Sequence, residues 1–215
     1  MKAPFLVFDL DGTLIDGYAA IADALSFAME RLGLKALPAA SVRRMVGHGL
    51  EKLLEEAVGA ERAPEGVRLF RERYGEVAIS GTVLMPDVPG VLETLSRRGH
   101  PMALASNKPA AFSRRILEAK GVDRFFLAVG GPDSETPPKP SPVMLRRLIH
   151  AAEADPAGTL VVGDMEVDSE FARAGSCRVV LVAGGSRSKE ELEKVDRDGL
   201  LDRLKDLPRW LEKQA

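Results

Sequence analysis

Hydrophobic and polar positions follow three different patterns along the chain. An apolar run at residues 5–8 ends at Asp9 and Asp11, as a strand covered on both faces would. Between about Asp16 and about Leu84, apolar residues recur at helical spacing and no segment has the pattern of a strand. This stretch predicts a block of helices over residues 19–32, 41–45, 50–58 and 67–78.

From Pro86 onward, short apolar runs alternate with helical periods. The predicted strands cover residues 102–106, 125–129, 159–164 and 178–182. The predicted helices cover residues 88–98, 110–120, 142–153 and 167–175, with helical segments again over 200–211. This alternation predicts an α/β fold with a doubly wound parallel sheet. We expect a core domain from residues 1–15 and 85–215, and a helical insertion over 16–84 whose linkers lie near Gly17 and Gly81.

Composition narrows the class of protein. With 45% hydrophobic and 29% charged residues, the chain is typical of a globular protein with a proper core. A formal net charge of −2 argues against nucleic acid or an anionic membrane as the main partner. No apolar run reaches bilayer length and no cleavage-site pattern follows Met1, so we expect a cytoplasmic protein. The single Cys177 fits a reducing compartment and is expected to fill space in the core.

Asp9 and Asp11 stand one residue apart at the end of the first strand, just before Gly12. Two such close acids repel each other unless a cation or a shared proton intervenes, which indicates a metal site or a pair of carboxyls with separated pKa values. The alternative is an Asx turn in which Asp11 caps the next segment.

Polar groups also follow the later strands. Ser106 and Asn107 end one, Asp164 ends another with Asp168 one helical turn on, and Lys139 lies in a proline-rich loop. Carboxyl ends of parallel strands share one edge of a sheet, so these groups are expected to converge. Carboxylates without a His or Cys cluster favour Mg²⁺. A lysine and a hydroxyl beside the metal suit a phosphoryl group, and an aspartate can serve as its nucleophile.

Four ordered motifs are similar to those of haloacid dehalogenase superfamily phosphatases. They are Asp9-Leu10-Asp11-Gly12-Thr13, Ser106-Asn107-Lys108, Lys139-Pro140 and Gly163-Asp164-Met165-Glu166-Val167-Asp168. The resemblance covers essentially the whole chain and implies that the helical block is a cap over the site. Gly47-His48-Gly49-Leu50 and Lys139-Pro140-Ser141-Pro142 most resemble the phosphoglycolate phosphatases.

The resemblance also implies a role for each motif residue. Asp9 would attack phosphorus, and Asp11 would act as general acid and then as general base. Ser106 and Lys139 would hold phosphoryl oxygens. The implied Mg²⁺ ligands are Asp9, the backbone carbonyl of Asp11, Asp164, and Asp168 through water or as a brace. The implied substrate-binding set is Thr13, His48, Ser106, Asn107 and Lys139, in which Thr13 and Asn107 mainly shape loops.

Each of these residues also has an ordinary structural interpretation. Lys139 alone would be a solvated lysine, and Ser106 a helix-capping residue. Asp168 would be a first-turn acid favoured by the helix dipole, and His48 a turn residue with an exposed ring. Lys108 is left as an unassigned neighbour of the substrate or the metal.

Two further features bear on substrate choice. Arg43 and Arg44 are candidates for a substrate carboxylate, although a solvated helix face explains either alone. Relatives often have a serine after the aspartate at the position of Gly17, and glycine is expected to make this linker more mobile.

Three functions remain in competition. The first is a Mg²⁺-dependent phosphatase that hydrolyses a small phosphorylated metabolite, 2-phosphoglycolate before others. The second is a sugar phosphomutase of the β-phosphoglucomutase type, which shares Asp9 and Asp11. The third is a binding or regulatory module that keeps the fold without catalysis. The expected assembly is a monomer or a homodimer, between which the residues do not choose.

Overall fold

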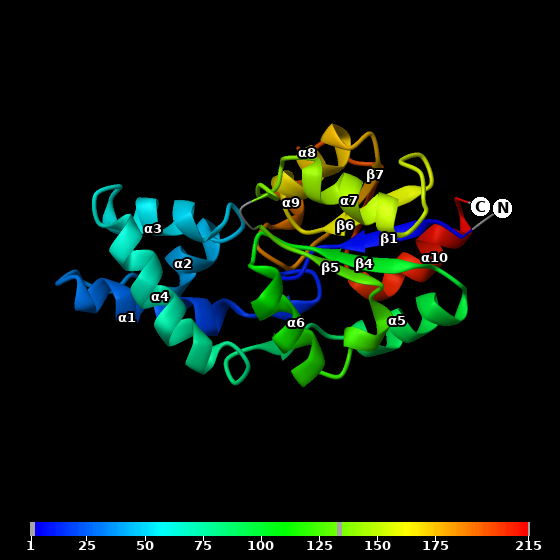
Figure 1. Ribbon diagram of the computed structural model, residues 1–215. Coiled ribbons are helices and arrows are strands. Elements are labelled where there is room, and N and C mark those ends of the chain that lie inside the picture. The colour runs from blue at the N-terminus through cyan, green and yellow to red at the C-terminus, as the bar shows by residue number, and fades with distance from the viewer. Residues whose placement is uncertain (1–2, 133–134, 215) are drawn as a thin grey trace.

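The computed structural model describes residues 3–132 and 135–214, and it has a parallel sheet covered by helices on both faces (Figure 1). The sheet has six strands in the order β5-β4-β1-β6-β7-β8, and neighbours pair in parallel. Their bounds are Ala128–Gly130 (β5), Met102–Ala105 (β4), Phe5–Phe8 (β1), Thr159–Gly163 (β6), Arg178–Val182 (β7) and Gly199–Leu201 (β8). The predicted α/β class with a parallel sheet is confirmed.

The strand β1 shows why an apolar run becomes a central strand. All four of its residues are buried, and successive side chains point to opposite faces. Leu6 and Phe8 enter the core beneath α5 (Val88–Arg97), α6 (Ala110–Ala119) and α10 (Leu207–Glu212). Phe5 and Val7 enter the core beneath the second group of helices. That group comprises α7 (Val143–Ala151), α8 (Glu166–Ala174) and α9 (Lys189–Leu192).

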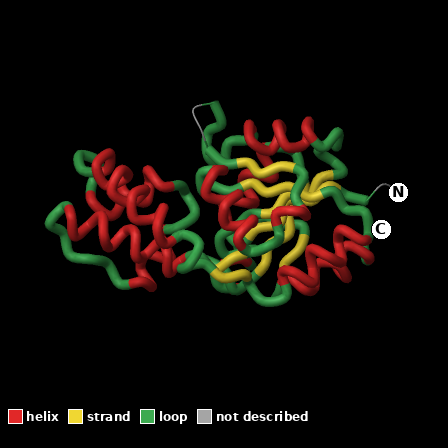
Figure 2. Tube along the Cα trace, turned by 60° about the horizontal axis from the view of Figure 1, so that its bottom comes forward, coloured by secondary structure: helices red, strands yellow, loops and turns green. Residues whose placement is uncertain are grey.

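Four helices form a separate group beyond the carboxyl ends of the strands (Figures 1 and 2). They are α1 (Tyr18–Arg31), α2 (Ala39–Met45), α3 (Leu50–Val58) and α4 (Ala63–Val77). The chain enters and leaves this group through two short antiparallel strands, β2 (Ile15–Asp16) and β3 (Val83–Leu84). The predicted helical insert is present, whereas its exact division from the core at residues 16 and 84 stays a prediction.

Four strands, β2, β3, β5 and β8, differ from the sequence-based expectation. The strand expected over 125–129 was wrong in its first residues, because Asp123–Phe125 form a 3₁₀ turn and the strand begins at Ala128. Phe126 instead turns its ring edge-on to Phe8, with 6.3 Å between centroids. Aromatic residues favour strands mainly through packing, and here the packing is satisfied from a loop.

The predicted helix over 200–211 was also wrong at its start. Gly199–Leu201 form β8, with Leu201 paired to Val182, before a 3₁₀ turn at Leu204–Asp206 and then α10. A strand of three residues is too short for its period to be recognised. The same holds for β2 and β3, each two residues long. Within the described residues, no helix is both long and apolar enough to cross a bilayer.

Candidate active site

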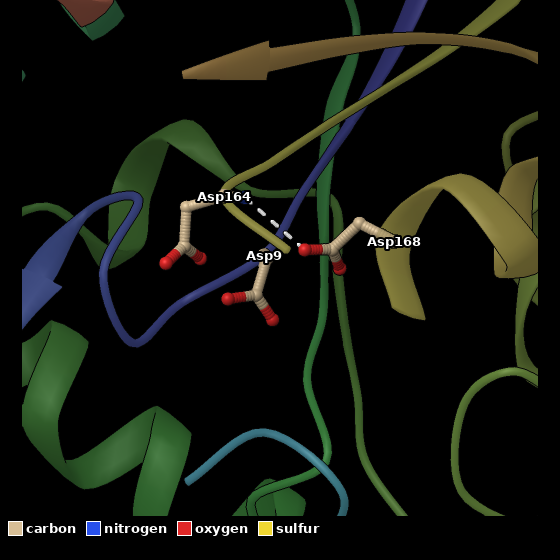
Figure 3. Close-up of side chains that lie close together, drawn as sticks. All are labelled: Asp9, Asp164 and Asp168. Atoms are coloured by element: carbon tan, nitrogen blue, oxygen red, sulfur yellow. Dashed lines mark hydrogen bonds between the residues drawn. The ribbon is translucent and has the colours of Figure 1, made fainter. Parts of the chain in front are cut away.

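Three carboxylates converge beyond the ends of adjacent strands. Asp9 follows β1, Asp164 follows β6, and Asp168 lies in the first turn of α8. One oxygen of each lies within 4.8 Å of the others, and all three residues are buried. Figure 3 shows the side chains of Asp9 and Asp164 lying next to each other, with the Asp168 carboxylate directed toward Asp9. We call these three residues the acid cluster.

Lys139 reaches into the acid cluster from its proline-rich loop. Its Nζ lies 2.6 Å from Asp9 Oδ1 and 2.7 Å from Asp168 Oδ1, and the residue is only 3% exposed. Burial disfavours the ammonium, but Asp168 and Asp9 outweigh this and raise the pKa of Lys139. The interpretation of Lys139 as a solvated lysine is therefore wrong.

Asn107 fixes the loop that carries Lys139. Its Oδ1 accepts from the Lys139 backbone N–H at 2.6 Å, and its Nδ2 donates to the Lys139 carbonyl at 3.1 Å. The same Nδ2 donates to the Gly47 carbonyl at 2.9 Å, which ties the loop to the helical insert. Asn107 therefore orients Lys139, in keeping with its expected loop-shaping role.

Asp168 is held on both oxygens. Oδ1 accepts from Lys139, and Oδ2 accepts from the backbone N–H groups of Asp164 and Met165, each at 3.1 Å. A Cβ on Gly163 would lie 2.2 Å from the Asp168 carboxyl carbon, so only glycine admits this approach. These contacts favour Asp168 as a brace for the loop over a direct ligand of a metal.

Asp164 is fully buried and is bound from two sides. Thr13 Oγ1 donates to its Oδ1 at 3.3 Å, and the Ser186 backbone N–H donates to its Oδ2 at 2.5 Å. Burial, reinforced by the charges of Asp9 and Asp168, raises the pKa of Asp164 well above its ordinary value. Thr13 thus orients an acid, in keeping with its expected loop-shaping role, and its place in the substrate-binding set stays a prediction.

The ionised carboxylate of Asp9 is destabilised by burial and by the neighbouring acids unless a cation lies beside it. Burial raises its pKa to about 7, with Lys139 lowering it and the charge of Asp168 raising it. When all three carboxyls of the acid cluster ionise, the one ammonium of Lys139 leaves two negative charges uncompensated. Hard oxygen donors with this charge fit a divalent cation of the Mg²⁺ type. Asp9 and Asp164 are the side chains best placed to hold it.

Asp11 is not part of the acid cluster and is paired with Lys108. Lys108 Nζ lies 2.8 Å from Oδ1 and 2.7 Å from Oδ2 of Asp11. Burial disfavours the Lys108 ammonium, but Asp11 more than offsets this and raises its pKa. A Cβ on Gly17 would lie 2.7 Å from Asp11 Oδ1. Close approach to Asp11 therefore explains the glycine that the sequence linked to a mobile linker.

One pocket joins these groups to the helical insert. Ser106, Lys108 and Lys139 line its base together with Asp9 and Asp11. Its opposite side, which we call the apolar wall, consists of Ile21, Val46, Leu50, Leu53 and Phe70. The pocket is thus charged on the side of the sheet and hydrophobic on the side of the insert.

The arrangement agrees with a comparison against protein families. The family described as haloacid dehalogenase-like hydrolase matches residues 6–182. The chain belongs to this family.

Several curated relatives of this haloacid dehalogenase-like hydrolase are named phosphoglycolate phosphatases. A phosphoglycolate phosphatase from Mesorhizobium japonicum is 35% identical, covering 86% of this chain and 85% of its own. One from Aquifex aeolicus is 32% identical, covering 84% of each. A solved structure, a predicted phosphoglycolate phosphatase from Haemophilus somnus, has a TM-score of 0.91 at 26% identity and covers 98% of each chain.

Other predicted residues of the hydrolase lie outside the pocket. His48 Nε2 is 3.9 Å from Glu166, which Arg187 binds through two hydrogen bonds of 3.0 and 2.7 Å. Arg43 donates to the carbonyls of Gly184 and Gly185, and Arg44 is mostly exposed. None of the three lines the pocket as the structure has it.

Sequence reasoning missed several residues at the hydrolase site. The Tyr18 hydroxyl bonds Ser186 Oγ at 2.5 Å, close to Asp164, and Tyr74 from α4 lines the pocket. The glycine pair Gly184-Gly185 just after the strand ending at Val182 was a usable sign of close backbone approach to the site. Nothing local to Tyr74 distinguishes it from a core aromatic residue on a helix.

Proposed function

We propose that this hydrolase is a Mg²⁺-dependent phosphatase that cleaves a small phosphate monoester, 2-phosphoglycolate, through an aspartyl phosphate on Asp9. The observation that carries the proposal is the buried Asp9 carboxylate, bonded to Lys139 and placed beside Asp164 at the carboxyl ends of the strands. A nucleophile, a fixed ammonium and a divalent-cation site within one pocket are what phosphoryl transfer needs.

In the first step, an Asp9 oxygen attacks phosphorus in line while the bond from phosphorus to the leaving oxygen breaks. Asp11 donates a proton to that oxygen, so that a neutral alcohol departs. In the second step, Asp11 takes a proton from water, whose oxygen attacks phosphorus. The bond from phosphorus to Asp9 then breaks, which restores the carboxylate and releases inorganic phosphate.

The remaining residues prepare the site. Lys139 and Ser106 hold phosphoryl oxygens, and Lys139 offsets the repulsion between Asp9 and an anionic substrate. Asp9, Asp164 and the Asp11 backbone carbonyl would hold Mg²⁺, with Asp168 bracing the loop. When bound, Mg²⁺ supplies positive charge for the phosphoryl oxygens.

The substrate is supported by the curated relatives, which are named phosphoglycolate phosphatases at 31–35% identity over most of this chain. We assign residues 16–84 as a cap that closes over the core of residues 1–15 and 85–215. Closure would place the apolar wall over the substrate and exclude water from the first step.

The test is phosphate release from a panel of monoesters by purified protein with Mg²⁺, with Asp9→Asn as the matched variant. We expect release by the wild type, highest kcat/KM for 2-phosphoglycolate, and none by the variant. Beryllofluoride should form an adduct on Asp9, visible in a crystal structure. If neither protein releases phosphate from any monoester and no adduct forms on Asp9, the chain is a binding module. Isomerised sugar phosphate with little free phosphate would indicate a mutase.

A further inference from the structure

Two buried polar side chains meet in the pocket beside Asp11, the residue proposed to protonate the leaving group. Lys108 Nζ lies 5.3 Å from the centroid of the Tyr74 ring, and both residues line the pocket. Lys108 is 9% exposed and Tyr74 is 2% exposed. Neither is assigned a step in the proposed reaction, although Lys108 is paired with Asp11.

The buried Tyr74 hydroxyl makes no hydrogen bond of ordinary geometry to residues 3–132 or 135–214, and the Lys108 ammonium is the charged group near enough to lower its pKa. Its ring cannot easily turn away, because it stacks on Phe70 at 5.3 Å and meets Phe112 edge-on at 5.1 Å. Burial raises the pKa of Tyr74, which keeps the hydroxyl protonated and able to donate. A buried hydroxyl without a partner is unfavourable, so its position is explained if a bound ligand supplies the acceptor.

Lys108 has donor capacity to share with the same ligand. An ammonium carries three N–H donors, and the two oxygens of Asp11 take at most two of them. The other lysine lining the pocket, Lys139, is held between Asp9 and Asp168. Lys108 is therefore the cation available on the side where the leaving group lies.

The surroundings select the kind of group that fits there. Leu53 and Phe70 of the apolar wall, together with Phe112 of α6, have no polar atoms to offer a ligand. Asp11 is the carboxylate that competes with a bound anion for the Lys108 ammonium. The low local dielectric strengthens the attraction between that anion and Lys108. A compact anion that accepts from both an ammonium and a phenol satisfies the two donors together.

We propose that Lys108 and Tyr74 form a subsite for a carboxylate on the leaving group of the substrate. The proposal rests on the proposed phosphatase function and specifies how that site selects its substrate. The ammonium of Lys108 pairs with one carboxylate oxygen, and the Tyr74 hydroxyl donates to the same group. The helical insert thus contributes a directional contact through Tyr74 as well as an apolar surface.

The experiment compares 2-phosphoglycolate with ethyl phosphate, which is of similar size but has no carboxylate. The quantity measured is the ratio of kcat/KM for the two substrates, with Mg²⁺ present. We expect Tyr74→Phe to lower this ratio about tenfold, and Lys108→Met to lower it about a hundredfold, because hydrogen bonds to charged groups are the stronger ones. Lys108→Arg should restore part of the ratio.

Tyr18→Phe is the matched control, because it removes the other tyrosine hydroxyl of the chain from near Asp164. It should change both kcat/KM values in parallel and leave the ratio intact. Thermal unfolding of each variant checks that the fold is kept. Tyr74→Phe should keep it, because the phenylalanine ring can still stack on Phe70.

The outcomes separate the two proposals. If the wild type hydrolyses p-nitrophenyl phosphate but has equal kcat/KM for 2-phosphoglycolate and ethyl phosphate, the subsite is wrong and the phosphatase function stands. A ratio that stays constant in both Tyr74→Phe and Lys108→Met also overturns the subsite. If the wild type hydrolyses none of the three esters, the phosphatase function fails and the subsite fails with it.

Discussion

The acid cluster and the apolar wall face each other across one pocket, yet they are built in different ways. Each carboxylate of the cluster is held by directional bonds, many from distant parts of the chain: Lys139 is 130 residues from Asp9, and Thr13 is 151 residues from Asp164. The residues of the wall come from one continuous stretch, 21–70, and meet the pocket through apolar contacts.

The two sides of the pocket therefore differ in how well they tolerate substitution. Loss of one partner in the cluster leaves a buried charge or donor uncompensated, which is costly. Loss of a methyl group from the wall removes non-directional contact and leaves other groups to adjust. The cluster therefore fixes the reaction, whereas the wall can vary with the leaving group.

The largest effect is expected from Asp9→Asn. An amide cannot serve as the nucleophile, so kcat should fall by about 10⁴-fold or more, measured as phosphate release with Mg²⁺. Folding should survive, because Asn107, Thr13 and the other partners of the cluster remain. If the variant retains a tenth of the wild-type kcat, Asp9 is not the nucleophile and the proposed mechanism is wrong.

Lys139→Met should rank second. Removing the ammonium leaves Asp9 and Asp168 buried together without their shared counter-charge. We expect the free energy of unfolding at pH 7 to fall by about 3–5 kcal/mol, measured by urea denaturation in a chelator. Arg68→Met, which removes an exposed arginine paired with Glu65, is the matched control for losing a cation. If the free energy of unfolding changes by the same small amount in the two variants, Lys139 does not offset a repulsion between Asp9 and Asp168.

Metal removal should reveal a pH dependence that belongs to the cluster. The pKa of Asp9 is raised to about 7, so between about pH 4 and pH 7 the folded protein holds a proton that the unfolded chain has released. In a chelator, the free energy of unfolding should therefore fall as pH rises through this window, by roughly 3–4 kcal/mol. Carboxyls with a lowered pKa, such as that of Glu166, change the free energy of unfolding only at pH values below about 4.5, so they do not contribute to this slope.

Mg²⁺ binds the carboxylate form and should remove this slope. Urea denaturation at pH 5 and pH 7.5, with a chelator or with Mg²⁺, measures it. Asp9→Asn should reduce the slope in the chelator and leave the part that comes from Asp164, whose pKa is also raised. A stability that rises from pH 5 to pH 7.5 without metal would show that Asp9 is ionised throughout.

The smallest effect is expected in the wall. Leu53→Ala truncates a side chain that is 5% exposed and should lower the free energy of unfolding by about 2–3 kcal/mol. Its kcat on p-nitrophenyl phosphate should change less than tenfold, because no directional contact to the phosphoryl group is lost. A fall in kcat comparable to that of Asp9→Asn would erase the distinction between the two sides of the pocket.

The sequence was enough to predict that Asp9, Ser106, Lys139 and Asp164 meet, because each follows or adjoins a strand with a clear pattern and parallel strands end together. It was not enough for β8, since three residues at Gly199–Leu201 acquire their pairing from β7. Such short strands are decided by tertiary contacts and leave no period to recognise.

The contacts of Lys108 with Asp11 and Tyr74 could not be predicted from local sequence patterns. Lys108 bonds Asp11 across 97 residues, and Tyr74 stands beside it because α4 packs on α1 and α3. A lone lysine and a helical tyrosine have many equally ordinary positions. Their meeting depends on how the helical insert sits above the sheet, which hydrophobic spacing along α4 does not encode.

The separation of Asp9 from Lys139 has a consequence for protein synthesis. Asp9 leaves the ribosome 130 residues before the lysine that neutralises it, a delay of about 7–26 s at usual elongation rates. During that interval, β1 cannot be buried with an ionised Asp9 at native cost. Until the loop of Lys139 emerges, β1 can therefore be buried at native cost only with Asp9 protonated, and the lysine takes over the compensation afterwards.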